Sequence, residues 1–151
     1  MKTPPLSTNC VRLLALLLIA YFGLSSTAQA VNPPPDGGYP GGNTAEGTNA
    51  LLGLTSGTYN TAVGFLSLDA NRTGNFSTAI GAGTLFANTA DENTATGAAA
   101  LFSNSTGAGN TADGSFALFS NTTGTQNVAI GWHTLQSDVI GSFNTAIGFD
   151  Q

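Results

Sequence analysis

The sequence contains little that could support catalysis, metal binding or crosslinking. Its 151 residues include one cysteine, Cys10, and one histidine, His133. A lone cysteine excludes an intramolecular disulfide framework, and a lone histidine excludes a histidine-based metal cluster. Phosphate-binding loops and nucleophile-elbow motifs are also missing. We therefore predict no catalytic residue, no metal site and no cofactor, and we expect that the protein is not an enzyme.

Positive charge is scarce as well. The three basic residues are Lys2, Arg12 and Arg72, so beyond residue 30 a single Arg opposes eight acidic residues, for a net charge of −7. Nucleic acids and anionic membranes are bound through clusters of Lys and Arg. We expect neither as a partner, and uncharged Asn, Thr and Ser supply most of the polar surface.

The N-terminal segment has the features of an export signal. Lys2 and Arg12 precede an uncharged apolar run, residues 13–22, and small residues lead to Ala28-Gln29-Ala30. This order predicts a signal peptide over 1–30 and a secreted or cell-surface protein. The alternative is a membrane anchor, but the run is shorter than the ~20 residues that a helix needs to span the bilayer. Cleavage leaves no membrane span. Residues 31–42, rich in Pro and Gly, are predicted to be a linker.

The remainder of the chain, 43–151, repeats one motif. Its copies open NTAEG, NTAVG, STAIG, NTATG, NTADG, NVAIG and NTAIG, at a spacing of seventeen residues. The consensus is N-T-A-x-G-x-x-A-L-x-x-N-x-T-G-x-x, whose positions are numbered below from the first Asn. The segment between Asn88 and Asn93 is one residue short, which marks a loop. Six full copies and a truncated seventh predict a stacked repeat architecture.

Three columns of the repeat are nearly constant and are predicted to be structural. Alternating strand residues share a face, so Ala at position 3 and Gly at position 5 predict a face without room for large side chains. The Leu at position 9 is expected to fill the coil interior. These residues are Ala45, Gly47, Leu51, Ala62, Gly64, Leu68, Ala79, Gly81, Leu85, Ala95, Gly97, Leu101, Ala112, Gly114, Leu118, Ala129, Gly131, Leu135, Ala146 and Gly148.

The segment Asn-x-Thr-Gly recurs at 71–74, 104–107 and 121–124. Because Asn and Gly tolerate left-handed backbone geometry, it predicts a corner. Stacked asparagines at this corner can also share amide hydrogen bonds between coils.

These patterns favour an all-β, parallel β-solenoid with one repeat per turn. A helical interpretation fails because no 3.6-residue apolar period is present. Disorder is the stronger alternative, but low-complexity disorder need not keep its apolar columns in phase. Strands about 4.8 Å apart would make a rod on the order of 30 Å long.

NVAIG, NTAIG and NTAVG, each followed by a glycine corner, resemble the head repeats of YadA-like trimeric autotransporter adhesins. They also resemble repeats of bacterial and phage tail-fibre-like surface proteins. The resemblance covers residues 43–151 and implies a left-handed β-roll, an adhesin or fibre function, and self-association as a homotrimer. The partly apolar fourth position (Val63, Ile80, Ile130, Ile147) is a further motive for the trimer, whereas Glu46 and Asp113 weigh against it.

Isolated features have plainer interpretations. Asp91-Glu92 could gather calcium ligands, but no known calcium-loop spacing is present, so a solvated acidic turn is favoured. Sequons at Asn71, Asn75, Asn104 and Asn121 follow from the repeat itself. Beside Trp132, His133 is interpreted as a packing variation. A column of Phe86, Phe102 and Phe119 is interpreted as packing or as a contact surface.

Three functions remain open at this stage. The favoured one is a secreted adhesin or fibre segment. The alternative is an ice-binding solenoid using the ladder Thr44, Thr61, Thr78, Thr94, Thr111 and Thr145, which Val128 interrupts. A polysaccharide-cleaving enzyme would need two carboxylates on one face, and Glu46 and Asp113 are four coils apart.

Overall fold

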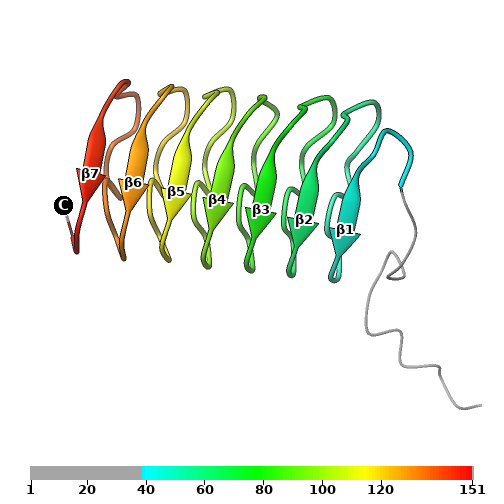
Figure 1. The fold of residues 1–151 in the computed structure, drawn as a ribbon, viewed down its shortest axis with the longest axis horizontal. Helices are drawn as coiled ribbons and strands as arrows, with labels where there is room; N and C mark the ends of the chain where they lie inside the picture. Colours follow the sequence, from blue (N-terminus) through cyan, green and yellow to red (C-terminus); the bar gives the residue numbers. More distant parts are fainter. Residues whose placement is uncertain (1–38, 151) are drawn as a thin grey trace, which may run out of the picture.

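A row of short parallel strands organises the chain. The computed structural model describes residues 39–150 and contains seven strands: β1 Thr44–Glu46, β2 Thr61–Val63, β3 Thr78–Ile80, β4 Thr94–Thr96, β5 Thr111–Asp113, β6 Val128–Ile130 and β7 Thr145–Ile147. They form one parallel sheet in chain order, and each coil returns behind the sheet to the next strand (Figure 1). The predicted all-β solenoid of seventeen-residue repeats is confirmed.

The register of the parallel strands follows the sequence repeat throughout the sheet. Thr pairs with Thr and Ala with Ala from β1 to β5, and the shortened third copy leaves this alignment unchanged. Alternation along each strand turns position 3 inward and positions 2 and 4 outward. Ala62, Ala79, Ala95 and Ala129 are therefore fully buried.

The leucine column fills the interior as predicted, but with an unexpected backbone. Leu68, Leu85, Leu101 and Leu118 are completely buried. Their φ values are 50° to 52°, in the left-handed region that bulky residues seldom adopt. Backbone bonds between coils continue through this segment, since Leu68 N–H donates to the Thr84 carbonyl at 3.0 Å. The coil is thus hydrogen-bonded to its neighbours well beyond the three-residue strands.

The fifth-position glycines are required for a different reason from the one predicted. They lie just after each strand rather than on the buried face, and they are only partly buried. Gly64, Gly81 and Gly114 have φ of 128°, 134° and 143°. A Cβ on Gly114 would lie 2.4 Å from the carbonyl oxygen of Gly131 in the next coil. Close stacking along the rod axis, with a left-handed backbone, excludes every side chain here.

The predicted corner at Asn-x-Thr-Gly is present, but its backbone is not left-handed. Neither Asn71 nor Gly74 has a positive φ. Instead, Gly74 N–H donates to Asn71 Oδ1 at 2.9 Å, and Asn71 Nδ2 donates to the Gly74 carbonyl at 3.1 Å. The side chain closes the corner as an Asx-type turn. Glycine is still needed, because a Cβ on Gly74 would meet the Ala90 carbonyl at 2.6 Å.

The predicted signal peptide, 1–30, and residues 31–38 of the predicted linker lie outside the described residues. The described part of the linker, 39–42, lies against the first coil. Tyr39 N–H donates to the Asn43 carbonyl at 3.2 Å, and Tyr59 N–H donates to that of Gly41 at 2.9 Å. Among residues 39–150, no helix has the length and hydropathy of a membrane span.

Candidate functional surfaces

A buried ladder of asparagines at position 1 joins the coils. Asn60 donates its backbone N–H and its Nδ2 to Asn43 Oδ1, at 2.8 and 3.1 Å. Asn110 does the same to Asn93, and Asn127 to Asn110. Each Nδ2 also donates to the carbonyl at position 15 of its own coil, at 2.7 to 2.9 Å. Sequence reasoning missed this ladder, although the near-constant Asn before Thr-Ala was the available signal.

Ser77 interrupts the ladder in the third coil. Its hydroxyl accepts the N–H of Asn93 at 3.3 Å, a weaker bond than those elsewhere. Asn93 Nδ2 compensates by donating to Asn88 Oδ1 at 3.1 Å. The third coil is also the one shortened between Asn88 and Asn93. The two irregularities therefore lie together, and a side chain from a second ladder bridges them.

That second ladder lies at position 12, as the sequence predicted. Asn104 Nδ2 donates to Asn88 Oδ1 at 2.8 Å, and Asn121 Nδ2 donates to Asn104 Oδ1 at 2.9 Å. The next coil has Asp138 here, which has no amide to donate, and Asn121 Oδ1 is buried without a partner.

Burial of these asparagines also determines whether the sequons can be glycosylated. Asn71, Asn104 and Asn121 are fully buried, so glycosylation there is incompatible with the folded coil. Asn75 is partly buried.

The outer face of the sheet carries two parallel columns. Position 2 presents the threonines in register from Thr44 to Thr111, all partly or fully exposed, followed by Val128. Position 4 mixes exposed apolar and polar side chains: Val63, Ile80, Ile130 and Ile147 are 37%, 43%, 38% and 70% exposed.

The two acidic residues of the fourth column are not brought together. Glu46 lies on β1 and Asp113 on β5. With ordinary strand spacing they are about 19 Å apart. The separation is too large for a pair of glycosidase carboxylates, which lie within about 10 Å.

Aromatic rings stack along the rod outside the sheet. Phe86, Phe102 and Phe119 stack at centroid distances of 5.0 and 5.3 Å and are half-buried. Tyr59 and Phe76 stack at 5.3 Å and remain 62% and 58% exposed.

His133 belongs to a second group of rings. It lies between Phe116 and Trp132, and its Nδ1 contacts Gln136 Oε1. A half-buried ring with a side-chain partner fits the packing interpretation better than a general base.

The acidic turn Asp91-Glu92 is exposed and has a structural role. Asp91 Oδ1 accepts the N–H of Asn75 at 2.7 Å and its Nδ2 at 3.1 Å. This carboxylate occupies the place of Asn75 in the preceding coil, whose Oδ1 accepts from Thr58 N–H at 2.9 Å. Across residues 39–150, no group of three or more potential metal ligands gathers.

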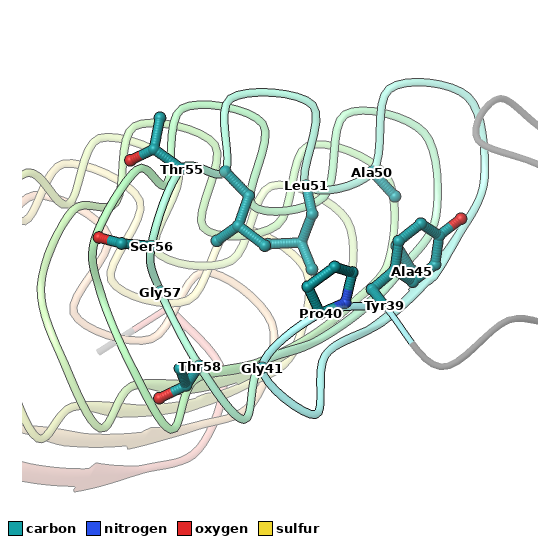
Figure 2. A pocket seen from close by; sticks show the side chains of 11 residues that line it. Tyr39, Pro40, Gly41, Ala45, Ala50, Leu51, Thr55, Ser56, Gly57 and Thr58 are labelled. Carbon is teal, nitrogen blue, oxygen red and sulfur yellow. The ribbon is translucent and has the colours of Figure 1, made fainter.

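A cavity of about 460 Å³ opens at the N-terminal end of the solenoid. Its apolar walls are Ala45, Ala50, Leu51 and Leu54. In Figure 2, Tyr39 and Pro40 lie on one side of the opening and residues 55–56 on the other. We call this the N-terminal cavity.

The chain matches no described protein family, no curated protein and no solved structure.

Proposed function

We propose that the protein is a secreted or cell-surface structural protein of the adhesin type, in which the solenoid is a rod-like display or fibre segment. The observation that supports this most directly is the division between interior and surface. The near-constant residues, Asn, Ala, Gly and Leu, are used in stacking one coil on the next. The variable positions face outward and form long parallel columns, as expected for a protein that acts through an extended surface.

Binding of the exported chain to abiotic surfaces, matrix proteins and cells tests the proposal. The matched control replaces Val63, Ile80 and Ile130 by Thr, the residue that the fourth coil carries at the same position as Thr96. These side chains are outward, so the control should fold normally and bind less. Absence of binding by the unmodified protein in its oligomeric form would refute the adhesin function.

We further propose that the rod self-associates, with a homotrimer as the expected assembly. The apolar side chains of position 4 are the reason, because a lone rod leaves Ile80 43% and Ile147 70% exposed. Sedimentation at micromolar concentration tests this. The unmodified chain should sediment as an oligomer and the triple Thr control as a smaller species, whereas a monomeric unmodified chain would exclude self-association.

Ice binding is the second candidate, and the register of the threonines favours it. Identical side chains at the strand spacing of about 4.8 Å form a regular array able to order water. Against it, the neighbouring column carries Glu46 and Asp113, and Val128 breaks the array. Thermal hysteresis separates the two functions: an adhesin rod should show none, and a clear hysteresis that Thr78→Asp abolishes would favour ice binding.

A further inference from the structure

The outer face of the sheet is divided into apolar and polar blocks along the rod. Each coil takes the number of its strand, from β1 to β7 (Figure 1). The side chains at position 4 are, in chain order, Glu46, Val63, Ile80, Thr96, Asp113, Ile130 and Ile147. At this position coils 2 and 3 are therefore apolar, coils 4 and 5 are polar, and coils 6 and 7 are apolar again.

Other exposed hydrophobic side chains follow the same division. Next to the strands in the sequence, they are Tyr59, Phe65 and Phe76 at β2 and β3, and Trp132, Phe143 and Phe149 at β6 and β7. Among residues 39–150, no large hydrophobic side chain between Ile80 and Ile130 is exposed to this extent. The rod thus has two apolar patches, at coils 2–3 and coils 6–7, which a polar belt at coils 4–5 separates.

This order is symmetric about the boundary between coils 4 and 5. Read from either end, coils 2–7 present two apolar, two polar and two apolar side chains at position 4. A twofold pair needs a face that is complementary to itself, because every contact occurs twice. In an antiparallel pair, coil 2 faces coil 7 of the second copy, coil 3 faces coil 6, and coil 4 faces coil 5. The facing residues are then Val63 and Ile147, Ile80 and Ile130, and Thr96 and Asp113.

The acidic residues distinguish this direction from the parallel one. Parallel rods in register would also match the patches, but they would place Glu46 and Asp113 each against its own copy. Like charges that face each other across an interface are destabilising. In the antiparallel pair Asp113 faces the uncharged Thr96, and Glu46 of coil 1 faces none of coils 2–7.

The size of the face fits a weak pair. Coils 2–7 extend over about 29 Å at a spacing of about 4.8 Å, and positions 2–6 are about 16 Å across. Two such faces cover roughly 1,000 Å² in total, which is near the lower limit for a specific interface. We therefore expect the pair to form at micromolar concentration and to exchange its chains readily.

We propose that the outer face of the sheet binds a second copy of the chain in the antiparallel direction, so that each apolar patch covers the other patch of its partner. This inference rests on the self-association proposed above and specifies its direction. It gives a pair in place of the homotrimer, whose three parallel rods would gather three copies of Asp113 around one axis. The same measurements decide between the two assemblies.

Crosslinking tests the direction. In the chain with Cys10→Ser, which has no other cysteine, Ile80→Cys and Ile130→Cys are prepared separately and treated with a short bismaleimide, alone and mixed. Facing residues of packed sheets are about 10 Å apart, whereas two copies of residue 80 in the antiparallel pair are separated by three coils, about 14 Å along the rod. Crosslinked pairs are therefore expected in the mixture and not in either variant alone.

The other outcomes separate this proposal from self-association as such. Crosslinking of each variant with itself would show parallel rods and overturn the antiparallel pair, while self-association would stand. Oligomeric sedimentation without crosslinks would place the contact on another face and would also overturn the pair. A monomeric unmodified chain would refute self-association itself.

A charge at Thr96 gives a second test, because the two directions predict opposite signs. Thr96 is exposed at position 4, so Thr96→Lys and Thr96→Glu should both fold. In the antiparallel pair the new Lys faces Asp113 twice, and we expect association several-fold tighter with Lys and weaker with Glu in sedimentation equilibrium at low salt. In a parallel assembly each new charge meets its own copy. Weaker association of both variants, or no change in either, would overturn the antiparallel direction.

Discussion

The asparagine ladder at position 1 provides the sharpest test of how the coils are held together, through Asn110→Ala. The Asn110 side chain is fully buried and makes four hydrogen bonds. Its Nδ2 donates to Asn93 Oδ1 at 3.2 Å and to the Gly124 carbonyl at 2.9 Å. Its Oδ1 accepts the N–H and Nδ2 of Asn127 at 3.0 and 3.1 Å.

The expected loss depends on which partners keep another bond. In the variant, the Gly124 carbonyl still accepts a hydrogen bond from Asn121 Nδ2, and Asn93 Oδ1 still accepts one from the backbone N–H of residue 110. Asn127 Nδ2 still donates to the Gly141 carbonyl. The buried N–H of Asn127 is the group left without a partner. An orphaned buried donor costs about 1–3 kcal/mol, and the other lost bonds add to it. We expect a loss of about 3 kcal/mol in the free energy of unfolding, a large part of the 5–15 kcal/mol typical of a domain.

Urea unfolding followed by far-ultraviolet circular dichroism measures this loss. The matched control is Asn75→Ala, which removes an asparagine that bonds Thr58 N–H at 2.9 Å but lies at the partly exposed rim. Water can replace its bonds, so we expect about 1 kcal/mol or less. Both variants should keep the parent denaturant slope, since altered cooperativity would confuse the comparison. If Asn110→Ala were no more destabilising than Asn75→Ala, the ladder would not stabilise the rod.

Three further substitutions and one control test the stacking, and the same titration measures each. Gly114→Ala places a Cβ against the backbone of the next coil at φ 143° and should lower the free energy of unfolding by more than about 3 kcal/mol. The control is Gly109→Ala, whose Cβ would meet only a side chain, at 3.5 Å, and which should cost about 1 kcal/mol. Similar losses for the two would contradict the backbone-contact explanation. Leu101→Ala should cost about 2–5 kcal/mol by opening a cavity, and a smaller loss would mean that the coil collapses around it. Asp138→Asn should stabilise by up to about 1 kcal/mol, because the new amide can donate to the unpartnered Asn121 Oδ1 while Asn144 Nδ2, which loses Asp138 Oδ2, keeps Asn127 Oδ1 as acceptor; destabilisation would refute this.

The sequence was sufficient to predict the architecture because its columns keep phase. Ala at position 3 and Leu at position 9 are the small and large halves of one interior, and both are buried as expected except at the C-terminal end, where Leu135 and Ala146 are partly buried. Parallel register follows directly from stacking identical repeats. The shortened copy was also located correctly, since Asp91 and Glu92 lie in an exposed turn.

The conformational preferences of single residues could not predict the backbone geometry of the segment that leads from one strand to the next. Leu85, Phe76 and Phe116 have φ of 52°, 55° and 61°, although such residues strongly disfavour the left-handed region. The Asn and Gly of the corner, which tolerate that region, do not adopt it. Stacking decides instead: Asn71 is required for its amide, and Gly74 for the carbonyl of the adjacent coil.

The residues with left-handed backbone geometry explain why the residue types on the outer surface can vary. Positions 7 and 9, and position 17 as well, have positive φ in successive coils, and each such residue other than glycine costs about 1–2 kcal/mol. A single coil cannot offset this cost, so its conformation depends on hydrogen bonds to both neighbours. Those bonds come from the backbone, from buried Asn and from polar side chains of the return segment such as Thr55 and Asp91, and among the described residues no position-4 side chain supplies one. Position 4 can therefore carry Glu46, Val63 or Asp113 on the same strand geometry. Stacking thus fixes the residue types of the interior and leaves those of the outward position 4 free to change, and a display surface requires this arrangement.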